Sequence, residues 1–100
     1  MASKAVGSSF GVARSANVIA VKCWNVDREA YLSDIVAGIS YIMFEAMESK
    51  RPSVANFSWH CRSTPALVKA AASAIAAGVH IVAAAGNSHT EVFNFPCDGE

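Results

Sequence analysis

The sequence predicts an α/β fold of three layers, in which helices cross between parallel strands in the order β-α-β-α-β. Three short apolar segments alternate with two longer segments whose apolar residues recur every three or four positions. The short segments are apolar on both faces, so helices are expected to cover both sides of the sheet. Strands and helices that alternate in this way are typical of a parallel sheet with right-handed crossovers.

The first half of the chain predicts one strand and one helix. The strand is expected at 17–22, a β-rich run that follows small residues. The helix is expected over 33–49, with Ser33 as its N-cap and Asp34 in its acidic first turn. Pro52 prevents the helix from continuing. The apolar face consists of Ile35, Ile39, Ile42, Met43, and either Met47 or Ala46.

The second half predicts a strand at 53–58, a helix at 64–77 and a last strand at 79–85. The motif Thr64-Pro65 provides an N-cap followed by proline in the first turn, which are helix-start signals. Gly78 follows the helix at the position where a left-handed residue commonly ends it. We expect the first two strands to lie side by side, with the third strand next.

Composition excludes several classes of protein. Apolar residues make up 53 % of the 100 residues and charged residues 16 %, with eight basic and eight acidic side chains. A disordered chain would be less apolar and more charged, and a nucleic-acid binder would be basic. No apolar run approaches the roughly 20 residues that span a membrane. So few charges leave apolar surface uncovered, and we therefore expect self-association.

Cysteine and histidine residues do not indicate a metal site. The chain has Cys23, Cys61 and Cys97, an odd number, so at least one is free or paired elsewhere, and buried thiols are the simplest interpretation. His60 and Cys61 are adjacent, whereas zinc ligands usually come in pairs two to four residues apart. Neighbours on a strand point to opposite faces, which argues against a Cys–His nucleophile pair. No glycine-rich phosphate loop follows a strand, so no cofactor is expected.

Four segments carry a resemblance to a known family. They are 10–22, 33–39, 51–58 and 76–87, which read FGVARSANVIAVK, SDIVAGI, RPSVANFS and AAGVHIVAAAGN. In order and spacing they resemble the catalytic domain of subtilisin-like serine proteases, peptidase family S8, and most of all its proteinase K-like fungal branch. The resemblance implies a partial subtilisin-like fold, with 1–100 as part of that domain. It also implies serine endopeptidase activity on peptide or protein substrates for the family.

The resemblance covers the middle of that domain and does not include the catalytic triad. The family's His-Gly-Thr-His and Gly-Thr-Ser-Met-Ala motifs are absent from these 100 residues. The aspartates and the histidines present do not lie in triad contexts; they are Asp27, Asp34, Asp98, His60, His80 and His89. We therefore expect the chain to be inactive by itself. The segment Met1-Ala2-Ser3-Lys4 is not followed by the apolar stretch of a signal peptide, although the family is mostly secreted, so no localisation is predicted.

Three short segments match functional positions of the family. Asn87 matches the oxyanion-hole asparagine, whose amide would donate to the developing negative charge. Without the resemblance, Gly86-Asn87 would be interpreted as an ordinary turn that ends a buried strand. Ser58, Trp59 and His60 match the substrate-binding strand, and Arg28, Glu29 and Ala30 match the second substrate-binding segment. Both segments lack the family's glycines, and the large side chains that replace them are expected to crowd the cleft.

Three hypotheses about function follow. The first is a serine endopeptidase by resemblance whose chain is incomplete and inactive alone. The alternative is a small non-catalytic α/β module, derived from a subtilase, that binds a peptide or a protein. The third is a truncated product without a function of its own. The family's calcium sites lie mostly outside the matched segments, and no acidic cluster replaces them, so no metal is expected.

Overall fold

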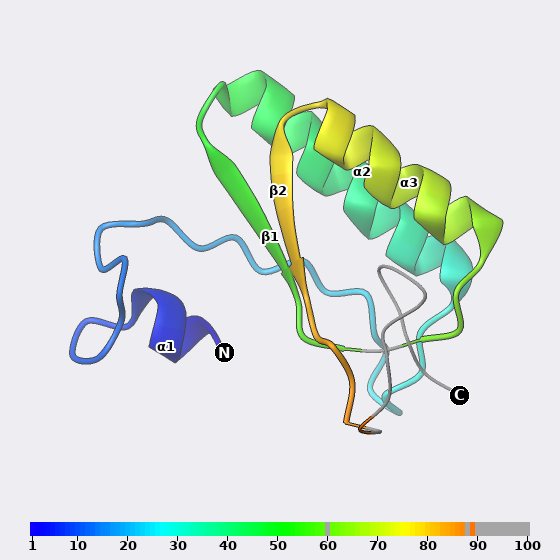
Figure 1. The fold of residues 1–100 in the computed structure, drawn as a ribbon, viewed down its shortest axis with the longest axis horizontal. Helices are drawn as coiled ribbons and strands as arrows, with labels where there is room; N and C mark the ends of the chain where they lie inside the picture. The colour runs from blue at the N-terminus through cyan, green and yellow to red at the C-terminus, as the bar shows by residue number, and fades with distance from the viewer. Residues whose placement is uncertain (60, 88, 90–100) are drawn as a thin grey trace.

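The computed structural model describes residues 1–59, 61–87 and 89. Along the chain these residues form α1 (Ala2–Val6), α2 (Leu32–Ser49), β1 (Ser53–Phe57), α3 (Pro65–Ala76) and β2 (Val79–Ala83). The two strands pair in parallel, and α3 makes the crossover between them. The α/β class, the parallel pairing and the adjacency of these two strands are therefore confirmed (Figure 1).

Both long helices pack on one face of the strand pair. The core contains Ile35 and Ile39 from α2, Phe57 from β1 and Leu67 from α3, and it is closed by alternate strand residues. The opposite face is open, since Val54 is 69 % exposed and its neighbour strand presents Val82 at 56 %. Among the described residues there is thus one helical layer, and the expected second layer is not present.

The expected strand at 17–22 is not formed. This segment runs from the α1 region toward α2 without joining the sheet (Figure 1). Val18 and Ile19 are both more than half exposed. A strand is stable only when its backbone groups bond to a neighbouring strand, and no hydrogen bond between this segment's backbone and another backbone group is found within the described part of the chain. The β-propensity of residues 17–22 predicts an extended segment, but a strand forms only where a neighbouring strand pairs with it.

Helix α2 ends at Ser49, as expected, but its start and its N-cap differ from the expectation. Its N-cap is Tyr31, without a side-chain hydrogen bond, so the assignment of Ser33 as the cap was wrong. Ser33 lies within the first turn, beside the predicted acidic Asp34. The residue after the helix, Lys50, has a left-handed φ of 54°, and its N–H donates to the Ala46 carbonyl. The observed cap therefore lies two residues before the predicted one.

Helix α3 agrees with the sequence prediction. The Thr64 hydroxyl accepts a hydrogen bond from the Leu67 N–H at 3.3 Å, and Pro65 is the first helical residue. After the helix, Gly78 has a φ of +94°, which glycine adopts without the strain that a side chain would add. The chain therefore reverses directly into β2, and its residues Val79–Ala83 pair with Ser53–Phe57 in register.

A glycine allows the segment before α2 to lie close to that helix. A Cβ atom added at Gly38 would lie 2.5 Å from Cys23 Sγ and 3.3 Å from Val21 Cγ1. The shorter contact is closer than real Cβ atoms show, so a side chain at position 38 would force Cys23 to shift. The contact positions the chain just before the predicted substrate-binding segment that contains Arg28, Glu29 and Ala30.

Candidate functional site

The ends of the two strands meet at one edge of the sheet. Parallel strands place their carboxyl ends together, and the Phe57 carbonyl accepts a further hydrogen bond from the Ala84 N–H at 3.0 Å. Ser58 and Trp59 follow β1 at this edge, and Asn87 follows β2 there after a turn. Gly86 has a φ of +85° in that turn. The strand pairing thus brings two of the three predicted site segments to one edge.

Asn87 is exposed at this edge. No hydrogen bond to its side chain is found among residues 1–59, 61–87 and 89. The role of Asn87 as an oxyanion donor remains a prediction.

Ser58 is bonded back to the strand that it follows. Its hydroxyl and the Asn56 side-chain amide bond to each other, with Asn56 Nδ2 to Ser58 Oγ at 2.8 Å and Ser58 Oγ to Asn56 Oδ1 at 3.1 Å. Both residues are exposed. This pair fixes the first residue beyond β1, so the chain leaves the sheet in a defined direction. His60, the third predicted residue of this segment, lies outside the described residues.

Trp59 belongs to a cluster of three aromatic rings. Its ring stacks on Phe57, with centroids 5.1 Å apart and planes 29° apart. The edge of Trp24 meets it at 5.3 Å and 65°. Phe57 is buried, whereas both tryptophans are only partly buried and Trp59 packs against the core. The large side chain that replaces the family residue is therefore held by packing and does not extend freely into solvent.

The segment with Arg28, Glu29 and Ala30 forms a closed turn. The Asn25 side-chain oxygen accepts from the N–H groups of Asp27 and Glu29, both at 2.9 Å, and the Asn25 N–H donates to the Glu29 carbonyl at 2.9 Å. Arg28 has a φ of 62°, which is strained for a residue with a side chain. Both backbone groups of Glu29 thus form hydrogen bonds within this turn. Of these three site residues, only Ala30 packs against the core.

Trp24 links the two predicted substrate-binding segments, and sequence reasoning missed it as a site residue. It directly precedes the turn at 25–29 and contacts Trp59, which follows β1. A single tryptophan in a sequence is most simply explained as a core residue. Its partial exposure beside Trp59 is a tertiary feature without a local sequence signal.

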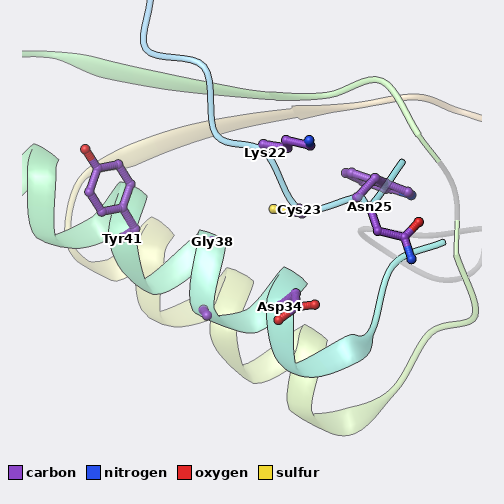
Figure 2. Close-up of a pocket in the computed structure, with 8 residues that line it drawn as sticks. Lys22, Cys23, Asn25, Asp34, Gly38 and Tyr41 are labelled. Atoms are coloured by element: carbon purple, nitrogen blue, oxygen red, sulfur yellow. The ribbon is translucent and has the colours of Figure 1, made fainter. Parts of the chain in front are cut away.

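A pocket of about 520 Å³ lies between the 22–25 segment and α2 (Figure 2). Its walls include Lys22 and Cys23 on one side and Asp34 and Tyr41 on the other. Burial and the nearby Asp34 carboxylate raise the pKa of the Cys23 thiol. The thiol is therefore protonated at neutral pH and is a poor nucleophile. The sequence did not predict this pocket.

Cys23 and Cys61 are not equivalent, which corrects the interpretation of the cysteines as buried thiols; Cys97 lies outside the described residues. Cys61 is disulfide-bonded, and it packs against the core four residues beyond Phe57. Cys23 is a free, partly buried thiol. Across the described residues, no three histidine, cysteine or acidic side chains are grouped to hold a metal ion.

Sequence comparisons identify the family. A model of the subtilase family matches residues 1–99. The chain belongs to the subtilase family. It is 37 % identical over 92 residues to cerevisin from Saccharomyces cerevisiae, and 34 % over 89 residues to alkaline serine exoprotease A from Vibrio alginolyticus. It is 38 % identical over 88 residues to subtilisin-like protease 1 from Arthroderma gypseum.

These matches cover most of this chain and a small part of each relative. They include 85 %, 89 % and 86 % of this chain, but only 14 %, 16 % and 18 % of the three relatives. The comparisons therefore confirm the predicted subtilase resemblance, including its similarity to fungal members. Within the described residues, no helix combines the length and the apolar character that a membrane crossing needs.

Proposed function

We propose that residues 1–100 provide the substrate-binding edge and one oxyanion donor of a subtilisin-like serine endopeptidase. The observation that supports this most is the shared edge at the ends of β1 and β2, closed by the bond between the Phe57 carbonyl and the Ala84 N–H. Subtilase membership supports the class of reaction, which is hydrolysis of a peptide bond in a peptide or protein substrate.

In this proposal Asn87 donates its side-chain N–H to the carbonyl oxygen of the substrate. Attack on that carbonyl makes the oxygen negative, so a fixed donor stabilises the transition state more than the ground state. Removal of such a donor typically lowers the rate by about 10²- to 10³-fold. Ser58 and Trp59 after β1 and the turn around Arg28 and Glu29 flank the substrate.

The 100-residue chain is not expected to hydrolyse peptides by itself. These residues contain no family nucleophile or base motif, and an oxyanion donor cannot act without a nucleophile. The test treats the purified chain with a fluorophosphonate probe and with a chromogenic peptide, and an active subtilisin-type protease serves as the control. We expect no labelled serine and no release of the chromophore. Stoichiometric labelling of a serine would contradict the proposal.

A second candidate function is that of a non-catalytic peptide-binding module. It is favoured by the packed aromatic cluster, because the rings of Trp59 and Trp24 form an apolar surface beside the end of β1. The chain has two tryptophans, and both belong to this cluster, so tryptophan emission reports on it without interference. Titration with an alanine-rich tetrapeptide amide should change the emission under this alternative, and a Trp59→Ala variant should abolish the change.

Self-association is also part of the proposal. The open face of the strand pair exposes Val54 and Val82, and α2 exposes Tyr41, Phe44 and Met47. Large exposed apolar surface of this kind favours association, and a net charge of zero does not oppose it. Size-exclusion chromatography with light scattering should therefore give a mass above 10.5 kDa. A monodisperse 10.5 kDa species with a cooperative thermal transition would contradict this expectation.

A further inference from the structure

Asn56, Phe57 and Ser58 at the end of β1 form the acceptor motif for N-linked glycosylation. The motif requires asparagine, then any residue except proline, then serine or threonine, and these three positions read Asn-Phe-Ser. It occurs once in the 100 residues, because every other asparagine has a different type of residue two positions later. The sequence therefore offers one acceptor for an N-linked glycan.

The side chain of Asn56 lies on the exposed face of the strand pair. Successive strand residues point to opposite faces, and both neighbours of Asn56, Ala55 and Phe57, are buried in the core. Asn56 itself is exposed. It shares its face with Val54, and on β2 the register places Val82 beside it. A glycan is bulky and belongs at the surface, so Asn56 can carry one without displacing the core.

The serine of the motif contacts the amide that reacts. Asn56 Nδ2 donates to Ser58 Oγ at 2.8 Å, and Ser58 Oγ donates to Asn56 Oδ1 at 3.1 Å. Residues two apart on an extended chain lie on the same side, so the spacing of the motif brings the hydroxyl beside the amide. A hydroxyl that accepts from an N–H draws the proton away from the nitrogen, which makes that nitrogen a better nucleophile. The geometry at the end of β1 therefore suits the chemistry of the motif.

We propose that Asn56 is an N-glycosylation site and that its glycan covers the exposed face of the β1–β2 pair. In the reaction Asn56 Nδ2 attacks the anomeric carbon of a lipid-linked oligosaccharyl pyrophosphate, the donor that an oligosaccharyltransferase uses. The new N–C bond forms, the bond from that carbon to the pyrophosphate oxygen breaks, and the released pyrophosphate takes up the amide proton. Cys61 is disulfide-bonded, which is typical of proteins from oxidising compartments such as the endoplasmic reticulum lumen, where this transfer takes place.

The glycan has a consequence for association. Attached to Asn56, it lies over Val54 and Val82, which are 69 % and 56 % exposed. Exposed apolar surface of this kind favours contact between chains, and a hydrated glycan on it opposes that contact. This consequence rests on the proposed self-association, whereas the attachment of the glycan does not.

The test directs the whole chain into the secretory pathway of a yeast with a leader that is cleaved off on entry. Mass spectrometry should then show a leader-free chain that carries added sugar mass. Peptide N-glycosidase F should remove this mass and leave aspartate at position 56. Asn56→Gln and Ser58→Ala should each abolish the added mass, and Ser58→Thr, the matched control, should keep it. A leader-free original chain without the glycan, or sugar that persists in Asn56→Gln, would overturn the proposal.

A second measurement tests whether the glycan covers the exposed face. Light scattering compares the glycosylated chain with an Asn56→Asp variant, which has the residue that removal of the glycan leaves. The glycosylated chain should have the lower average number of protomers at equal concentration. Equal association of the two would overturn the covering of this face. A monomeric Asn56→Asp chain would contradict the proposed self-association and the covering together, but it would leave the glycosylation site, which the mass measurement decides, unaffected.

Discussion

At the residue scale, single side chains decide how closely the segments that build the site approach each other. Gly38 admits Cys23 against α2, Asn25 closes the turn at 25–29, and Trp24 meets Trp59. The resemblance predicts Asn87, Ser58 and the 28–30 segment as site residues. It could not identify Trp24 or Gly38, because their importance depends on contacts between residues that are distant along the chain.

Gly38→Ala is expected to destabilise the chain. The new Cβ would lie 2.5 Å from Cys23 Sγ, so the segment must move, and overpacking of this kind costs about 1–3 kcal/mol. Alanine alone would favour a helix by about 1 kcal/mol over glycine. In a Cys23→Ala background the same substitution should therefore cost much less. Urea unfolding of the four variants measures this, and equal costs in both backgrounds would contradict the contact.

Cys23 is expected to react slowly with iodoacetamide at neutral pH. Burial and Asp34 raise the pKa of its thiol above the usual value of 9.0, so the reactive thiolate is scarcer than in an unfolded chain. The midpoint of rate against pH should lie above 9.0, and Asp34→Asn should move it down. A midpoint below that value would contradict the assignment.

The same shift has a consequence for stability. Because the folded-state pKa of Cys23 is raised, the protonated thiol is favoured in the folded chain and the thiolate is disfavoured. The contribution of the Cys23 thiol to the free energy of unfolding is fully present below its pKa in the unfolded chain. That contribution is lost as pH rises through its pKa in the folded chain. Urea unfolding should therefore show a fall in stability above about pH 9 that is smaller in Cys23→Ser. An identical fall in both chains would contradict this.

At the element scale, prediction succeeded where local chemistry determines structure. Helix α3, its cap at Thr64 and the glycine at position 78 follow from local signals. The parallel pairing of β1 and β2 follows from the crossover between them. The 17–22 segment failed as a strand, because apolar composition does not ensure a partner for its backbone. Ser33 was wrong as the cap, because the helix already begins at Leu32 and places Ser33 in its first turn.

Removal of the Thr64 cap provides a test at this scale. Thr64→Ala leaves the Leu67 N–H without its side-chain acceptor, which typically costs about 1 kcal/mol in the free energy of unfolding. Thr64→Ser is the matched control, because it keeps the hydroxyl and should be close to the original chain. Urea unfolding distinguishes them, and an alanine variant as stable as the serine variant would mean that the cap does not contribute.

At the scale of the whole molecule, the chain is an α/β unit of the subtilase family with one exposed sheet face. Ser58, Trp59 and Asn87 follow the carboxyl ends of its two strands. Family membership explains the four matched segments. The chain also has the Trp24–Trp59 contact and a disulfide at Cys61. The proposed function therefore depends on whether the residues that follow β1 and β2 bind one peptide together.

Nuclear magnetic resonance of the isotopically labelled chain tests that point most directly. Addition of an alanine-rich tetrapeptide amide should shift the backbone amides of Ser58 and Trp59 and the side-chain amide of Asn87 at one common peptide concentration. Amides in α3 should remain in place and serve as the internal control. Shifts confined to the pocket beside α2, or no shifts at saturating peptide, would contradict the account.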